Sequence, residues 1–306
     1  MPGWPSGLIQ VKDGFYAYID PEGGWFKSNT GIIDAGDYTV LVDTQYNEPR
    51  MKNILRLIEE KGLPEPRIII NTHHHGDHVW ANHAVHGAVV VSHMVTARLI
   101  EMSKDLEPSM FKAFFPELDF TGSRYTPPNI VYEGGVGKLN LPNEVKLSLV
   151  YMGPAHTPGD TMVVVEGEGI VYTGDLVFYK VTPFALDGYL KGWIDVVEKS
   201  LLEMDVEHYV PGHGPVTGKS GVEEMLGYLK LVYEIAIEAH KKGVKPLEAA
   251  LDADLGKYSE WVDRERIVGN LYRAYMELEG EPPAKPVENL ASIALDMISY
   301  RNRISG

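Results

Sequence analysis

Residues 72–78 read Thr-His-His-His-Gly-Asp-His and follow directly on the run of isoleucines at residues 68–70. Consecutive β-branched residues favour a buried strand, so the histidine-rich segment is predicted to begin where a strand ends. Alternate residues of an extended segment point to the same side, which allows His73 and His75 to contact one metal ion. The segment therefore requires a fold that leads a buried strand into a metal-binding loop.

The end of the same segment can supply a second group of ligands. Asp77 and His78 are adjacent, and in a tight turn they point away from the first pair and can hold another ion close by. The chain contains no cysteine, so every protein ligand to a metal must be His, Asp or Glu. Imidazole nitrogen and carboxylate oxygen suit zinc and its first-row neighbours.

Composition limits the kinds of partner. The chain has 306 residues, 44% hydrophobic and 23% charged, which is long enough for one large or two modest domains with a sizeable core. Its formal net charge of -15 repels phosphate backbones and anionic membranes, so we expect a small-molecule substrate and neither nucleic acid nor membrane. No signal-like amino terminus and no run of about 18 apolar residues is present, which predicts a cytoplasmic protein.

Short apolar runs precede each further polar candidate along the chain. Residues 31–44 are predicted to form a hairpin, and residues 48–61 a helix with apolar positions three and four apart. Strand-like runs then precede three more candidate ligands: residues 145–151 before His156, residues 170–172 before Asp175, and residues 208–210 before His213. Because strand ends can meet at one edge of a sheet assembly, these side chains are expected to share a site.

The remaining chain is predicted to be mainly helical. Residues 222–242, 262–279 and 287–302 have helical patterns, which divides the chain into a catalytic domain at 1–218 and a helical C-terminal extension at 219–306. The extension can pack on the sheets, on the rim of the site or on a second subunit in a homodimer. Residues 93–118 combine a helical stretch with several aromatics; they can form a lid or simply pack onto the sheet.

Taken together, the motifs resemble the metallo-β-lactamase superfamily. The resemblance rests on the order of five motifs between about residues 25 and 218, namely Val42-Asp43-Thr44, residues 73–78, Gly153-Pro-Ala-His156-Thr-Pro-Gly159, Thr173-Gly174-Asp175 and Pro211-Gly212-His213-Gly214. It implies an α/β fold, the αββα sandwich, with a dinuclear site along one edge. The two ions are expected to be zinc, with iron, manganese or cobalt as alternatives.

The same resemblance implies a role for each candidate ligand. The first ion would be held by His73, His75 and His156, the second by Asp77, His78 and His213, and Asp175 would bridge both. A hydroxide shared by the two ions would be the nucleophile, and Asp77 would be the catalytic residue that orients it. Metal-bound imidazoles usually donate their other N–H to a neighbouring group, and Asp43, Asn71 and Thr72 are the candidates for this support.

The sequence motifs indicate the type of reaction more narrowly than they indicate the substrate. Aspartate at the bridging position resembles glyoxalase-II-like thioesterases, lactonases and phosphodiesterases rather than true β-lactamases. The predicted function is therefore broad hydrolysis of small-molecule esters, lactones or phosphodi- and phosphotriesters, with β-lactam hydrolysis at most a weak side activity. Aromatic residues after Asp175 are expected to line an apolar pocket, and these are Phe178, Tyr179, Phe184 and Trp193.

Three alternatives stay open. A glyoxalase-II-like thioesterase would need basic residues for glutathione on its C-terminal helices, and Lys241, Lys242 and Lys245 are more typical of a solvated helix end. A persulfide dioxygenase has similar motifs but uses one iron and molecular oxygen. A metal-stabilised binding scaffold is disfavoured because a structural zinc needs only four closed ligands.

Overall fold

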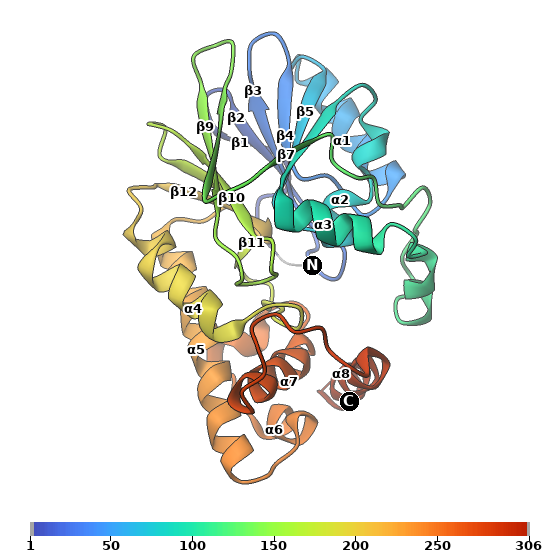
Figure 1. Cartoon of the computed structure of the whole chain (residues 1–306), viewed down its shortest axis with the longest axis vertical. Helices are drawn as coiled ribbons and strands as arrows, with labels where there is room; N and C mark the ends of the chain where they lie inside the picture. The colour runs from blue at the N-terminus through green and yellow to red at the C-terminus, as the bar shows by residue number, and fades with distance from the viewer. Residues whose placement is uncertain (1–2, 305–306) are drawn as a thin grey trace.

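A computed structural model describes residues 3–304 and contains two β-sheets packed face to face (Figure 1). The first sheet has seven strands in chain order, with antiparallel pairing up to β4 and parallel pairing from there to β7. Its strands are β1 (Gly7–Lys12), β2 (Phe15–Ile19), β3 (Thr30–Asp34), β4 (Thr39–Val42), β5 (Pro66–Asn71), β6 (Val89–His93) and β7 (Ile130–Tyr132).

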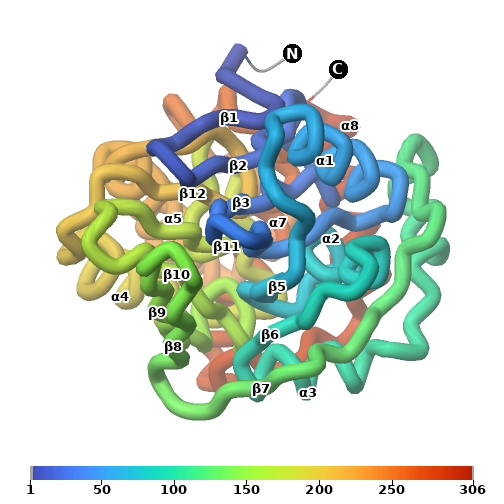
Figure 2. Tube along the Cα trace, turned by 90° about the horizontal axis from the view of Figure 1, so that it is seen from above, coloured from blue at the N-terminus to red at the C-terminus, as the bar shows by residue number. Residues whose placement is uncertain are grey.

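The second sheet has five strands in the order β12-β11-β10-β9-β8, and only the β11–β12 pair is parallel. Its strands are β8 (Val136–Asn140), β9 (Lys146–Tyr151), β10 (Thr161–Val165), β11 (Ile170–Phe178) and β12 (His208–His213). Figure 2 shows the two sheets side by side from above. Apolar side chains from the facing sides of both sheets form one large core.

Helices cover the outer face of each sheet. On the first sheet lies α1 (Glu48–Glu60), whose first turn is capped because the side chain of Asn47 accepts a hydrogen bond from the amide of Arg50. Its buried positions Met51, Ile54 and Ile58 pack on the sheet. The outer face of the second sheet is covered by α4 (Leu190–Lys199) and α5 (Lys219–Lys241) (Figure 1). The αββα arrangement predicted from the sequence is therefore confirmed.

The helical extension packs onto this sandwich rather than standing apart. It continues from α5 through α6 (Pro246–Asp252), α7 (Arg266–Leu278) and α8 (Leu290–Ile304), and buried residues of α5, α7 and α8 belong to the same apolar cluster as the sheets. The domain boundary at residue 218 stays a prediction, and residues 1, 2, 305 and 306 of the two predicted ranges lie outside the described residues. Among the described helices, none is long and apolar enough to cross a membrane.

The predicted elements agree with the observed ones, with two informative differences. Asp175 and His213 lie inside β11 and β12 rather than in loops after short strands, because β11 continues to Phe178 and β12 to His213 past irregular pairing between the two. Residues 93–118 divide into α3 (Met94–Ser103) and the short 3-10 helix η2 (Pro108–Ala113).

The remaining short helices are α2 (Gly76–Val79), η1 (Asn82–Ala84), η3 (Leu201–Glu203) and η4 (Gly256–Glu260).

Candidate metal centre

The histidine-rich loop begins where β5 ends, between the two sheets. After Asn71 the chain passes through the predicted ligands into the single turn of α2, which begins at Gly76. A Cβ atom on Gly76 would lie 2.0 Å from the ring of Trp80, so only glycine allows the loop to close onto this ring. The indole of Trp80 thus packs against the loop, and the imidazoles of His73 and His78 are buried.

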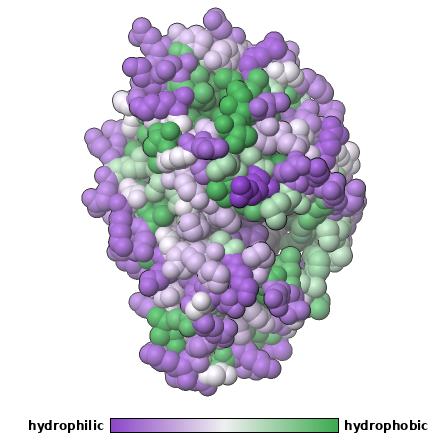
Figure 3. Space-filling model, in the orientation of Figure 1, coloured by the Kyte–Doolittle hydropathy of each residue, from purple (hydrophilic) through white to green (hydrophobic). Residues whose placement is uncertain are grey.

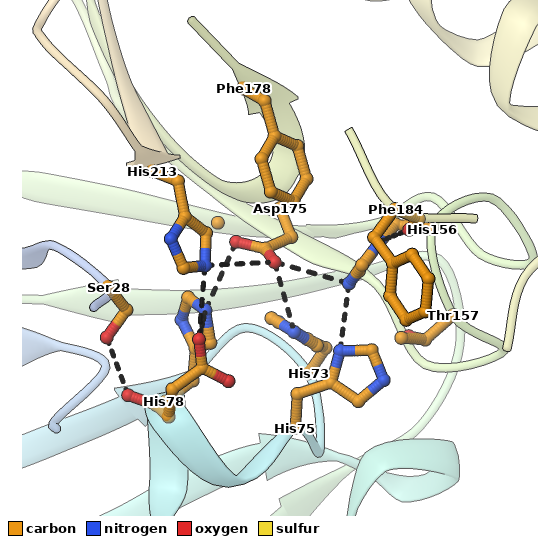
Figure 4. Close-up of polar contacts among 12 residues, drawn as sticks. Ser28, His73, His75, His78, His156, Thr157, Asp175, Phe178, Phe184 and His213 are labelled. Atoms are coloured by element: carbon orange, nitrogen blue, oxygen red, sulfur yellow. Dashed lines mark hydrogen bonds and ion pairs between the residues drawn. The ribbon is translucent and has the colours of Figure 1, made fainter. Parts of the chain in front are cut away.

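One group of donor atoms comes from this loop, from the segment after β9 and from β11. The ligand atoms of His73, His75, His156 and Asp175 lie within 4.8 Å of one another (Figure 4). His156 Nε2 is 2.9 Å from His75 Nδ1 and 3.3 Å from Asp175 Oδ2. His73 Nε2 is 3.8 Å from the same carboxylate oxygen. Three imidazoles thus converge on one side of Asp175.

A second group lies on the other side of the same carboxylate. Asp77, His78 and His213 also form a cluster within 4.8 Å, and His213 Nε2 is 3.1 Å from Asp77 Oδ2. Asp175 Oδ1 is 3.1 Å from His78 Nε2, and Asp175 Oδ2 is 3.5 Å from His213 Nε2. Asp175 therefore contacts both groups, and the chain brings together all seven predicted ligands in the two predicted sets.

The donor set fits metal ions. Among the described residues, His73 Nε2, His78 Nε2 and Asp175 Oδ1 are buried and form no hydrogen bond, since the 3.1 Å contact between the last two is not aligned as one. Buried polar atoms are normally paired. These three are ligand atoms of the two clusters, so an ion in each cluster would satisfy them. Nitrogen and carboxylate donors in this number suit zinc, iron, manganese or cobalt, and they exclude a thiolate site.

Comparison with known proteins identifies the family. The sequence model of the metallo-beta-lactamase superfamily matches residues 23–221 of the chain, a range that includes every residue of both clusters. The chain belongs to this superfamily. Members of the metallo-β-lactamase superfamily are mostly metallohydrolases, and the His and Asp clusters of this chain could hold the metal ions that such enzymes use.

Its relatives within the superfamily differ in what they act on. The chain is 25% identical over 210 residues to the alpha subunit of 2,4-dinitroanisole O-demethylase from Nocardioides sp. (strain JS1661), which covers 66% of this chain and 54% of that protein. It is 24% identical over 224 residues to a type 2 metallo-beta-lactamase from Bacillus sp. (strain 170), which covers 70% of this chain and 79% of the relative.

Solved structures show the same fold over most of the chain. The inverting sec-alkylsulfatase Pisa1 from Pseudomonas sp. superimposes with a TM-score of 0.66 at 16% identity, covering 89% of this chain and 50% of that protein. A metallo-beta-lactamase from Pontibacter korlensis superimposes with a TM-score of 0.58 at 18% identity, covering 74% of this chain and 99% of that one. The chain spans about half the length of the O-demethylase subunit and of the sec-alkylsulfatase.

In this member of the metallo-β-lactamase superfamily, neighbouring groups orient the candidate imidazole ligands. Asp43 accepts hydrogen bonds from the amide and hydroxyl of Thr72 at 2.8 and 2.6 Å, and its Oδ2 is 2.8 Å from His78 Nδ1. The hydroxyl of Thr72 lies 2.9 Å from His73 Nδ1. Asn71, the third predicted support, bonds instead with the side chain of Asn82 and so holds the loop without contacting a ligand.

Two further supports were not predicted. The carbonyl of Phe184 accepts a hydrogen bond from His156 Nδ1 at 2.7 Å, and the carboxylate of Asp187 is 3.2 Å from His75 Nε2. In each case the bonded nitrogen is the one opposite the ligand atom, which is how the ring orientation of a metal ligand is fixed. Both residues follow β11 in a loop, and no spacing in the sequence marks that loop as facing His75 or His156.

Burial and neighbouring charges shift the pKa values of the titratable groups of the centre in different directions. Burial lowers the pKa of His73 and brings the pKa of His156 to about 3, so both rings are neutral and keep a lone pair for a ligand bond. Burial also disfavours protonation of His78, but the carboxylates of Asp175, Asp77 and Asp43 outweigh it and raise the His78 pKa. Burial favours the neutral form of Asp77, yet the nearby imidazoles hold its pKa below the usual range.

A cavity of about 540 Å³ opens beside the two clusters. Phe178 and Phe184 line it, as the sequence predicted, but Tyr179 and Trp193 do not. Trp193 is fully buried in α4, where its ring lies 5.3 Å from the ring of His156 and its indole N–H donates to the carbonyl of Leu176. It therefore supports a ligand from behind. Tyr179 follows the last residue of β11 and lies under the ammonium of Lys180.

Proposed function

We propose that this chain is a dinuclear metal-dependent hydrolase of carboxylic esters, lactones or phosphoesters of small molecules, with zinc as the resident metal. The proposal rests on two three-residue donor groups, one of which clusters with Asp175 while the other contacts the same carboxylate through His78 and His213. A shared carboxylate is what two neighbouring dications need, because their mutual repulsion must be offset by a negative charge between them.

Each donor group has a place in this chemistry. His73, His75 and His156 would hold one ion, and Asp77, His78 and His213 the other, as the clusters are arranged. When bound, the ions would lower the pKa of bound water toward neutrality and polarise the scissile group. A site with seven donors for two ions leaves coordination positions open for water and substrate, as catalysis requires.

Asp77 is the residue best placed to handle protons. Its carboxylate lines the cavity and its Oδ2 lies 3.1 Å from His213 Nε2 and 3.6 Å from His78 Nε2. Because these imidazoles hold its pKa below the usual range, Asp77 is ionised at neutral pH and can accept a hydrogen bond from an attacking water molecule. It would take that proton as the water attacks and return it to the leaving group from the same position.

The alternatives have less support. Lys241 forms an ion pair with Glu238 on its own helix at 3.6 Å, and neither it, Lys242 nor Lys245 lines the cavity. The two arginines of the C-terminal helices that do line it, Arg266 and Arg301, are paired with Asp263 and Glu265, which argues against a glutathione thioester. A mononuclear iron dioxygenase would use one ion, so the second donor group would have no role in it. A binding scaffold would need neither an open position nor a cavity beside the ligands.

The test combines metal analysis with a substrate panel. We expect two metal ions per chain and hydrolysis that a chelator abolishes and added zinc restores. The panel should contain aryl esters, lactones, phosphodiesters and phosphotriesters, together with a thioester, a cephalosporin, an aryl methyl ether and a secondary alkyl sulfate, since relatives act on the last three. One iron per chain, an inert panel and oxygen uptake with glutathione persulfide would overturn the proposal.

A further inference from the structure

The cavity beside the metal centre is walled by segments far apart in the chain. One wall is the loop with Trp25 and Phe26, the second is residues 106–115, and the third is α8 of the helical extension. Phe26 lies at the centre of the aromatic side, with ring centroids 5.6 Å from Trp80 and 5.4 Å from both Phe111 and Phe115. Opposite these rings, α8 presents Leu290, Ala291, Ala294, Met297 and Ile298.

The charged groups of the walls, apart from the candidate ligands, already have partners. The guanidinium of Arg266 is 2.8 Å from the carboxylate of Asp263 and lies over the ring of Trp25. The guanidinium of Arg301 is 3.8 Å from Glu265, and Glu265 also accepts a hydrogen bond from the indole of Trp25. Asp187 contacts His75. The walls thus offer apolar contact and little net charge to a ligand.

Exposed apolar side chains continue from the cavity to the surface. Met110 on the aromatic side is 58% exposed and Leu290 on α8 is 54% exposed, and both line the cavity. Figure 3 shows hydrophobic side chains bordering a hollow on the right of the lower half, where residues 106–115 and α8 lie in Figure 1. Large exposed apolar side chains that surround a cavity are typical of a ligand-binding groove.

We propose that this cavity binds an uncharged hydrophobic arm of the substrate, an alkyl chain or an aryl ring, and that α8 sets the length it accepts. The proposal rests on the proposed function, because the scissile group must lie at Asp77 and Asp175 for the arm to extend toward α8. At about 30 Å³ for each non-hydrogen atom, the cavity holds on the order of ten to fifteen such atoms besides the reacting group. The preferred substrates are therefore amphiphilic esters or lactones of medium chain length.

The first experiment measures kcat/KM for the active head group of the panel while its alkyl chain is lengthened from two to twelve carbons. Burying one methylene group is expected to raise kcat/KM about three- to fourfold, until the cavity is full. A profile that is flat or falls from the shortest chain would overturn the proposal.

Matched variants on α8 test whether the cavity causes the dependence of kcat/KM on chain length. Ala294 lines the cavity, whereas its neighbour Leu295 is 62% exposed and does not. Ala294→Trp should move the optimum to shorter chains, and Leu295→Trp should leave the profile unchanged. Phe111→Ala enlarges the opposite wall and should move the optimum to longer chains, which provides a test even where Ala294→Trp does not fold. Equal profiles for all folded variants would contradict the role of α8.

A binding assay separates this proposal from the hydrolase proposal. The neutral dye N-phenyl-1-naphthylamine should bind the metal-free wild type and Leu295→Trp, and should bind Ala294→Trp at least tenfold more weakly. Long-chain alcohols should displace it. An inert substrate panel together with this binding pattern would reject the hydrolase and keep the apolar site, whereas absence of dye binding to the wild type would reject the apolar site.

Discussion

Gly212 is the position where the smallest change should disrupt the metal centre without removing a ligand. It lies in β12 beside β11, and a Cβ atom there would be 1.8 Å from Asp175 Oδ1 and 2.9 Å from the backbone carbon of Gly174. Ordinary contacts begin near 3.4 Å. Gly212→Ala therefore requires the shared carboxylate or the strand to move by roughly 1.5 Å, whereas metal ligands tolerate errors of about 0.2 Å.

We expect Gly212→Ala to weaken metal binding about 10- to 100-fold, which is the loss typical when a ligand is misoriented. Competition with a chromophoric chelator measures the affinity, and circular dichroism checks that the metal-free protein is folded. Gly218→Ala is the matched control, because its Cβ would meet the carbonyl of Glu207 at an ordinary 3.6 Å. Wild-type affinity in folded Gly212→Ala would refute the placement of Asp175 between two ions.

Three further outcomes follow from the same geometry. Asp77→Ala should lower kcat by at least about 100-fold on the preferred substrate, and an unchanged kcat would refute its proton-handling role. Asp187→Ala should weaken metal binding about tenfold because His75 loses its support, whereas Asp187→Asn can still accept that hydrogen bond and should retain most of the affinity. Equal affinities in both variants would contradict this. Lowering the pH from 8 to 6 should weaken binding at the site of His78 more than at the site of His156. Carboxylates raise the pKa of both imidazoles at the former site, His78 and His213, and a bound proton competes with metal there. At the other site only the pKa of His75 is raised, whereas burial keeps His73 and His156 neutral. Titration with a spectroscopically visible ion such as cobalt can resolve the two sites, and parallel losses would contradict the prediction.

The clustering of the candidate metal ligands could be predicted from the sequence because their motifs are short and local. His73, His75, Asp77 and His78 are adjacent along the chain, and each remaining ligand belongs to a short motif within or after a strand-like run. The alternation of side chains along an extended segment fixes which members of the motif share a side. The fold was implied by the resemblance of these motifs, in this order, to the metallo-β-lactamase superfamily, and helical periodicity predicted only the helices of the extension.

The residues around the centre could not be predicted in the same way. Trp193 and Phe184 are both aromatic and both follow β11, yet one is enclosed in α4 and the other faces the cavity. That difference depends on how a loop and a helix turn over the second sheet, which no spacing records. Asp187 was missed for the same reason, because a lone carboxylate in a loop resembles any solvated acid.

The candidate metal ligands and the walls of the cavity come from different parts of the fold. Asp175 and His213 lie within β11 and β12, and Asp77 and His78 lie in the single turn of α2, so hydrogen-bonded backbone holds four of the seven candidate ligands. The walls of the cavity come from a loop, the η2 segment and α8, and none of the seven candidate ligands belongs to these segments. Substitutions in α8 can therefore change which arm fits while the metal-binding residues keep their geometry. The helical extension is thus the part of this chain where substrate choice and reaction chemistry can be separated by mutation.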